Sequence, residues 1–144
     1  MGLDRDSIEA RLSKLHEILD VLRDYYTLTF DAFTADPLRE WGVEKALITL
    51  SAIVFDVANH ILASHFVAYP KTYEEGLDLL RQKRVISEEL HQEIKGLGGF
   101  RNILVHGYME VEAVKVFGNF QKAPIVFPRF AHEILVWLDS VETD

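Results

Sequence analysis

Residues 46–55, Ala-Leu-Ile-Thr-Leu-Ser-Ala-Ile-Val-Phe, form a nearly continuous apolar stretch in this 144-residue chain. The stretch predicts the middle of a long helix that runs from about Leu38 to Phe66. A helix that is apolar on nearly all sides has to be covered on more than one of them. We therefore expect this helix either at the centre of a helical bundle or in a subunit interface.

The segment from about Asp4 to Phe33 has the pattern of an amphipathic helix. Its apolar residues recur at spacings of three and four, which places them on one face: Ile8, Leu12, Leu15, Ile18, Leu19 and Leu22. Residues 25–30 are rich in side chains that favour strands. Ala35-Asp36-Pro37 then predicts a break before the long helix.

Beyond Pro70 the sequence predicts shorter helices. We expect them at about Tyr73–Arg81, Ser87–His106 and Glu110–Asn119, then a loop at residues 121–124 and a last helix at about Pro128–Val141. Alternating helices and short connections are typical of bundles. The chain 1–144 is thus expected to be a single all-α domain, an antiparallel helical bundle with four main helices plus short helices.

Composition narrows the class of protein. The chain contains no cysteine, so disulfides and thiolate metal sites are excluded. The charged N-terminus lacks the apolar core of a signal peptide, and no apolar run approaches the roughly 20 residues that cross a bilayer. The histidines lack metal-binding spacing. We therefore expect a cytoplasmic protein without membrane segment, metal or cofactor.

Charge is unevenly distributed along the chain. Fifteen Lys and Arg against 23 Asp and Glu give a net charge of −8, which argues against nucleic-acid binding by the whole surface. Residues 71–130, however, hold nine basic and eight acidic residues, or +1, and the remainder carries −9. Local cations are thus present, although a solvated surface accounts for most of them equally well: Arg81, Lys83, Arg84, Lys95, Arg101, Lys115, Lys122 and Arg129.

Residues 101–108, Arg-Asn-Ile-Leu-Val-His-Gly-Tyr, place a fixed cation, an imidazole and a phenol within two helical turns. The planar guanidinium of Arg101 can donate two hydrogen bonds to a phosphate and keeps its charge. The imidazole of His106 can accept and release a proton near neutral pH. Together the two side chains predict cleavage of a phosphodiester without a metal ion.

Helical geometry does not bring these groups together in one chain. At 100° per residue, Asn102 and His106 stack as an i,i+4 pair, and Arg101 lies at the border of the core-facing side. We therefore expect helix bending or a second subunit to complete the site.

A structural interpretation of the same residues is also open. A His in the last helical turn followed by Gly is a common helix ending, favoured by the helix dipole and by a left-handed glycine. Gly107 would then be that glycine, Arg101 a surface ion-pair residue and Tyr108 a packing residue. Capping and catalysis can coexist at His106.

Three glycines precede the motif, at positions 96, 98 and 99. Each costs up to about 1 kcal/mol in a helix interior. The Lys-Ser/Thr of a phosphate-binding Walker loop is absent. We expect them to permit either close approach of a neighbouring helix or a kink just before Arg101.

The pattern Arg-x4-His-x-Tyr, with Asn102 directly after Arg101, resembles the signature of the HEPN superfamily. Within it, the chain is similar to the HepT-like ribonuclease toxins of HepT/MntA toxin–antitoxin systems. The likeness covers most of the chain. It includes the stretches Asp56-x3-His60-Ile61, Pro70-x-Thr72-Tyr73-x-Glu75 and Gly99-Phe100-Arg101-Asn102. This wider likeness favours the functional interpretation of the motif.

The resemblance implies an endoribonuclease that needs no metal ion. The ribose 2′-hydroxyl attacks the adjacent phosphorus and leaves a 2′,3′-cyclic phosphate and a 5′-hydroxyl. His106 would transfer protons and Arg101 would stabilise charge on the phosphate. Asn102 would orient His106 or a phosphate oxygen, and Tyr108 would contact the substrate or help position the site.

The resemblance also implies partners. Cleavage needs a base and an acid, yet each chain offers one motif histidine, so we expect a homodimer with a composite cleft. The antitoxin of such systems is a nucleotidyltransferase that adds AMP to a toxin tyrosine, for which Tyr108 is the matching position. A bulky anionic adduct there would block the cleft and repel RNA.

The rival hypothesis is a non-catalytic HEPN module that binds nucleotide or helps a nucleotidyltransferase bind its substrate. The intact motif favours the enzyme, and the acidic net charge favours the rival. Elsewhere, Asp56 and His60 are expected to form a buried hydrogen-bonded pair. The large aromatic residues are expected to pack rather than stack on bases: Tyr25, Tyr26, Trp41 and Trp137.

Overall fold

The computed structural model describes residues 2–141, and within them every regular element is helical. The α-helices are α1 (Arg5–Leu22), α2 (Phe30–Thr34), α3 (Pro37–Phe66), α4 (Tyr73–Gln82), α5 (Glu88–Ile94), α6 (Leu97–His106) and α7 (Ala113–Ser140). Two 3-10 turns, η1 (Arg23–Tyr25) and η2 (Tyr108–Glu110), follow α1 and α6. The expectation of an all-α fold is confirmed.

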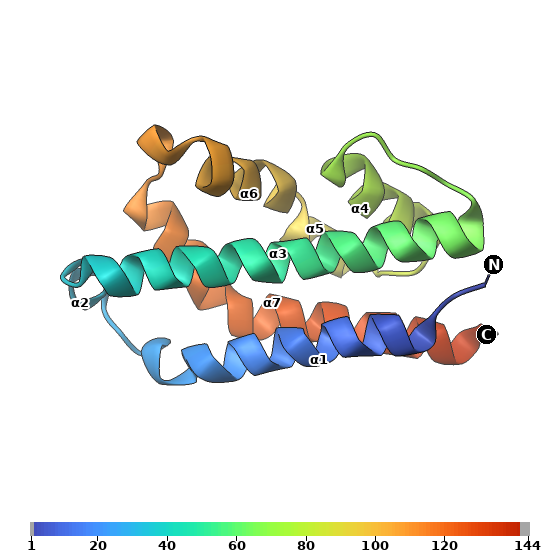
Figure 1. Cartoon of the computed structure of the whole chain (residues 1–144), viewed down its shortest axis with the longest axis horizontal. Helices are drawn as coiled ribbons and strands as arrows, with labels where there is room; N and C mark the ends of the chain where they lie inside the picture. The colour runs from blue at the N-terminus through green and yellow to red at the C-terminus, as the bar shows by residue number, and fades with distance from the viewer. Residues whose placement is uncertain (1, 142–144) are drawn as a thin grey trace.

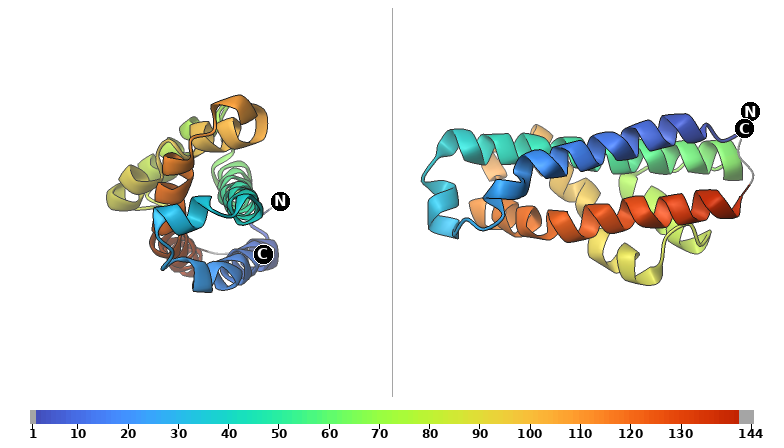
Figure 2. Two further views of the ribbon diagram at one scale, coloured as in Figure 1. Left: turned by 90° about the vertical axis from the view of Figure 1, so that its left-hand side faces the viewer. Right: turned by 90° about the horizontal axis from the view of Figure 1, so that it is seen from below.

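The chain traverses the bundle in alternating directions. Helix α1 runs one way, α3 returns, the α4–α6 segment runs back along it, and α7 returns again (Figure 1). This alternation is the antiparallel four-part bundle that the sequence predicted. Two further views show the three long helices α1, α3 and α7 side by side, with α4–α6 outside them (Figure 2).

Helix α3 occupies the centre of the bundle. It contacts α1 and α7 on one side and α4 and α6 on the other. Leu50, Val54, Ile61 and Leu62 on this helix are fully buried. By length and composition α3 could also cross a membrane, which the sequence analysis did not foresee, but 56% of its most apolar 18-residue window is buried within the protein.

The first predicted helix, at residues 4–33, is wrong at its end. Helix α1 stops at Leu22, and a 3-10 turn and a separate short helix, α2, follow. The hydroxyl of Thr29 accepts a hydrogen bond from the backbone N–H of Ala32 (3.1 Å), so Thr29 caps α2. Helix α1 therefore ends shortly before residues 25–30, the stretch that favours strands.

The predicted loop at residues 121–124 is also wrong. Helix α7 runs unbroken through both Pro124 and Pro128. A proline inside a helix costs about 3 kcal/mol because it removes a hydrogen bond and crowds the preceding turn. Three buried aromatic residues on this helix offset that cost, at about 1.5–3 kcal/mol for each buried large side chain: Phe120, Phe127 and Phe130.

The predicted buried pair of Asp56 and His60 does not form. Asp56 is exposed, and its carboxylate lies 3.9 Å from Nε of Arg11. The Nε2 atom of His60 accepts a hydrogen bond from the backbone N–H of Asp4 (3.1 Å). His60 therefore anchors the segment that enters α1, a role that depends on contacts far apart in sequence.

The aromatic residues divide between the core and the surface. Tyr26 packs on Phe120, with ring centroids 5.0 Å apart, and Trp137 packs on His65 at 5.1 Å. Trp41, at the start of α3, is 61% exposed, and Tyr25 is also exposed. The expectation that these two side chains pack in the core is therefore wrong.

The central position of α3 makes its burial the main source of stability. We expect Leu50→Ala to lower the free energy of unfolding by about 2–5 kcal/mol, because it leaves a cavity in the core. Leu38→Ala is the matched control, since Leu38 is 75% exposed on the same helix and Leu50 is 0% exposed. Surface changes usually cost less than about 0.5 kcal/mol. Urea denaturation measures both variants, and equal losses would contradict this assignment of the core.

Candidate active site

The helix that carries the motif is shorter than the sequence predicted. The expected single helix at Ser87–His106 is divided into α5 and α6 at Lys95 and Gly96. Lys95 is extended, with ψ 140°, and Gly96 has φ 91°, a left-handed conformation that favours glycine. The chain therefore does bend at the first of the three glycines, at the start of α6 rather than directly before Arg101, and the bend changes the direction of α6 relative to α5.

The carboxylate of Glu74, on α4, holds the start of α6. Its Oε1 accepts a hydrogen bond from the backbone N–H of Gly96 (2.7 Å) and its Oε2 from that of Gly98 (3.0 Å). Helix α6 has no side-chain cap of its own. A carboxylate at a helix N-terminus also interacts favourably with the helix dipole. Glu74 therefore fixes where the motif helix begins.

Gly98 lets α6 approach α4 closely. A Cβ atom at this position would lie 2.8 Å from Cβ of Tyr73, closer than two carbon atoms can approach without movement. At Gly99, by contrast, an added Cβ would meet nothing within 4 Å. The predicted close approach of a neighbouring helix is therefore confirmed at Gly98, and Gly99 is not needed for it.

Tyr73 is the surface against which Arg101 lies. The Cζ atom of Arg101 is 5.5 Å from the centroid of the Tyr73 ring, a cation–π distance. The Tyr73 ring also stacks on Phe55 of α3, with centroids 4.2 Å apart and an interplanar angle of 18°. Nη1 of Arg101 also makes a long hydrogen bond to Oδ1 of Asn102 (3.4 Å). Helices α3 and α4 thus set the direction of the guanidinium.

His106 and Tyr108 lie on an open surface at the other end of α6. Both side chains are exposed, Tyr108 by 77%, and neither makes a side-chain hydrogen bond within residues 2–141. Gly107 between them has φ −107°, so the predicted left-handed ending is wrong. Its backbone N–H donates to the carbonyl of Ile103 (2.9 Å), which closes the helix without a left-handed residue.

The fold therefore brings together only part of the predicted site. Arg101 and Asn102 are in contact, whereas His106 and Tyr108 stand at the end of the helix with no bond to Arg101 in the described residues. Leu104 is buried and Phe100 half-buried, so this side of α6 faces the core, and Arg101 lies half-buried at its border as predicted. One chain presents Arg101 and His106 on the same helix but does not enclose them.

Several of the local cations predicted from sequence are engaged in ion pairs. Arg81 bonds Asp78 (2.6 Å) and holds the pKa of that carboxyl below its usual range by hydrogen bonding. Arg129 pairs with Glu93. Arg101 makes no ion pair in the part of the chain described and remains available to an anion.

Tyr73 and Glu74 are the site residues that sequence reasoning missed. Their stretch was noted only as part of a resemblance. The signal in the sequence is the set of glycines at 96, 98 and 99, which predicts either the close approach of a neighbouring helix or a kink and does not identify the neighbour. Within residues 2–141, no three side chains of the metal-binding types are grouped to share an ion.

An all-α bundle that presents Arg-x4-His on one short helix, with Tyr in the turn that follows, has the features of a HEPN domain. A family model described as "Ribonuclease HepT-like" matches residues 15–134, which is most of the chain. The chain therefore belongs to the HepT-like ribonuclease family.

Individual proteins agree with this membership. The chain is 25% identical over 137 residues to "tRNA nuclease HepT" of Aphanizomenon flos-aquae (strain 2012/KM1/D3), covering 95% of this chain and 93% of that protein. The cytosolic protein of unknown function YutE from Bacillus subtilis shares the fold with a TM-score of 0.81 at 19% identity, over 96% of this chain and 92% of YutE.

A second solved structure is the tri-AMPylated HEPN toxin of Shewanella oneidensis in complex with an MNT antitoxin. It shares the fold with a TM-score of 0.80 at 23% identity, over 90% of this chain and 96% of the toxin chain.

The two neighbouring glycines allow a matched test of the α4–α6 contact. We expect Gly98→Ala to lower the free energy of unfolding by about 1–3 kcal/mol, because the new methyl group overpacks against Tyr73. Gly99→Ala should raise it by up to about 1 kcal/mol, because alanine favours the helix and meets open space. Thermal or urea unfolding measures both. Effects of the same sign would argue against this packing.

Proposed function

We propose that this member of the HepT-like ribonuclease family is an endoribonuclease toxin that cleaves RNA with Arg101 and His106 and needs no metal ion. The observation that carries the proposal is the arrangement of α6. Its Arg101 is set by Tyr73 and is free of ion pairs within residues 2–141, and its His106 is exposed to solvent. A fixed cation and a titratable imidazole are the groups that transesterification of RNA requires.

In the proposed reaction the ribose 2′-oxygen attacks the adjacent phosphorus. The bond to the 5′-oxygen breaks, giving a 2′,3′-cyclic phosphate and a 5′-hydroxyl. His106 takes or supplies the proton, and the guanidinium of Arg101 neutralises the charge that develops on the phosphate oxygens. Asn102 contacts Arg101 and orients it or a phosphate oxygen.

A homodimer is part of this proposal. The reaction uses a base and an acid, while each chain supplies one motif histidine. Exposed apolar side chains beside His106 support an interface there, since such side chains gain from burial. Tyr108 is 77% exposed and Met109 is 85% exposed. A second copy on this end of α6 would enclose a cleft that one chain leaves open.

We further propose regulation by a nucleotidyltransferase antitoxin that adds AMP to Tyr108. In that step the phenolic oxygen attacks the α-phosphorus of ATP and pyrophosphate leaves. Tyr108 is accessible, and its neighbour in the motif is His106. The added phosphate would compete with RNA for Arg101. That the Shewanella oneidensis toxin is described as tri-AMPylated, with an MNT antitoxin, supports this partner. A cytoplasmic location fits these partners.

The rival function is a non-catalytic HEPN module that binds nucleotide or assists a nucleotidyltransferase. The net charge of −8 is the observation that favours it. The two functions differ in whether His106 is needed for RNA to be cut.

Cleavage of labelled RNA in EDTA tests the proposed reaction, with tRNA as the first substrate because one relative is named a tRNA nuclease. We expect the wild type to leave cyclic phosphate ends. Arg101→Ala and His106→Ala should each cut at least about 100-fold more slowly, because charge stabilisation or proton transfer is lost. Arg23→Ala and His16→Ala, both exposed on the other side of the bundle, should retain activity.

Circular dichroism and light scattering establish that each variant is folded and dimeric. No cleavage by a folded wild-type dimer, or equal cleavage by all variants, would favour the binding module. A stable, fully active monomer would remove the composite cleft.

Incubation with the antitoxin and Mg-ATP tests the modification. Mass spectrometry should find AMP on Tyr108, and the modified protein should lose RNA cleavage because the adduct occupies the cleft. Tyr108→Phe should remain unmodified, and its own rate of RNA cleavage should be the same before and after the incubation. Tyr69→Phe is the matched control, since Tyr69 is 72% exposed but lies outside the motif. An unmodified Tyr108 would end this role for it.

A further inference from the structure

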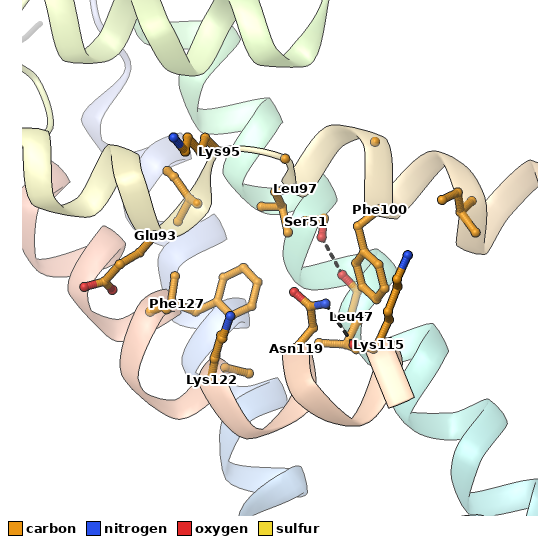
Figure 3. Close-up of a pocket in the computed structure, with 16 residues that line it drawn as sticks. Leu47, Ser51, Glu93, Lys95, Leu97, Phe100, Lys115, Asn119, Lys122 and Phe127 are labelled. Atoms are coloured by element: carbon orange, nitrogen blue, oxygen red, sulfur yellow. Dashed lines mark hydrogen bonds between the residues drawn. The ribbon is translucent and has the colours of Figure 1, made fainter. Parts of the chain in front are cut away.

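A cavity of about 420 Å³ lies beside the motif helix, between α6 and α7. Its walls come from α3, the α5–α6 junction, α6 and α7. The rings of Phe100 and Phe127 point into it from α6 and α7, and Leu97 closes one side (Figure 3). Its floor is therefore apolar and partly aromatic, which suits the flat face of a nucleobase.

Lysines form the rim of this cavity. Lys95, Lys115 and Lys122 line it, against a single carboxylate, Glu93. Glu93 is bonded to Arg129, and Lys115 lies 3.0 Å from Glu112. Neither of the other two lysines makes an ion pair within residues 2–141. A protein of net charge −8 thus keeps a cationic rim at this place, which an anionic ligand would neutralise.

One polar group inside the cavity is left available. Ser51 donates its hydroxyl hydrogen to the carbonyl of Leu47 (2.7 Å) and is thereby occupied. Nδ2 of Asn119 donates to the carbonyl of Lys115 (2.9 Å), which leaves its Oδ1 facing the cavity (Figure 3). That oxygen can accept a hydrogen bond from an amino or imino group on a base edge.

The cavity extends along α6 toward the His106 end of the motif. Gly99, Phe100 and Ile103 of α6 line it, whereas Arg101 lies against Tyr73 and Asn102 lines a separate hollow beside that ring. A second hollow shares Phe100, Ile103 and Lys115 with the cavity and extends toward the turn that follows His106. The two hollows together give an RNA strand bound at the His106 end of α6 a path to the cavity.

We propose that this cavity is a subsite for one nucleotide of the RNA that flanks the cleaved bond. The base lies against the half-buried ring of Phe100, Asn119 accepts a hydrogen bond from its edge, and Lys95 and Lys122 bind the adjoining phosphates. The inference rests on the proposed function for the identity of its ligand. It adds three positions, Lys95, Lys122 and Phe100, that bind the substrate without taking part in bond breaking.

RNA binding without cleavage tests the subsite. Every protein carries His106→Ala, so that a labelled single-stranded oligoadenylate stays intact, and fluorescence anisotropy gives Kd at several salt concentrations. Adding Lys95→Ala and Lys122→Ala together should weaken binding about tenfold or more. It should also reduce the slope of log K against log salt by about 1.4, since each phosphate contact to a single strand contributes about 0.7. Phe100→Leu, which keeps an apolar side chain, should weaken binding about tenfold through lost stacking.

Lys14→Ala together with Arg23→Ala is the charge-matched control, because it also removes two positive charges and both residues are exposed, on α1 and on the turn that follows it. Helix α1 lies on the opposite side of α3 from α6. The control should leave Kd nearly unchanged and so separate local binding from net charge. A double-lysine variant that binds like this control, or oligoadenylate binding that depends on no lysine, would overturn the subsite. Saturable lysine-dependent binding of free AMP but not of the oligomer would overturn its assignment to RNA.

These outcomes are independent of the cleavage assay. If the wild type cuts RNA but the lysine variants bind normally, the proposed function stands and the subsite fails. If the wild type cuts nothing but lysine-dependent binding is found, the subsite stands and the catalytic proposal fails.

Discussion

A helix of 30 residues that is apolar on nearly every side has to be covered on every side, and the rest of this fold follows from that requirement. Helices α1 and α7 cover one side of α3, and α4 and α6 cover the other. Short helices can cover a long one only if they lie close to it and to each other. Gly98 permits that close approach, because a Cβ atom there would overlap Tyr73 of α4. The position of the motif helix is therefore set by contacts with the neighbouring helices.

The second level of organisation is the contact between α4 and α6. Glu74 fixes the start of α6 by accepting two backbone hydrogen bonds. Tyr73 stacks on Phe55, and the guanidinium of Arg101 lies over the Tyr73 ring. Tyr73 thereby contacts both a buried side chain of the core, Phe55, and the motif residue Arg101. The opposite end of α6 has no such support, and there His106 and Tyr108 face solvent. Rigidity at one end and openness at the other suit a surface that binds a large, irregular substrate.

The sequence was informative wherever local pattern and packing agree. The all-apolar stretch of α3, the one-sided pattern of α1 and the facing of α6 could all be predicted, because each depends on residues close in sequence. The prolines of α7 could not, since tertiary burial of Phe120 and Phe127 outweighs the local penalty. The role of Glu74 could not be predicted either, because a carboxylate that caps a helix 22 residues away leaves no periodic pattern in the sequence. The role of His60 was predicted wrongly for the same reason, since its hydrogen-bond partner is the backbone of the distant residue Asp4.

The beginning of α1 and the end of α7 meet at one end of the bundle, where Nη2 of Arg5 lies 2.7 Å from Oδ1 of Asp139. The motif end of α6 lies toward the other end (Figure 1). A fluorophore, affinity handle or surface tether attached through either the first or the last helix would therefore sit away from His106 and Tyr108. The protein can be immobilised through either α1 or α7 while the surface around His106 and Tyr108 stays accessible to macromolecules.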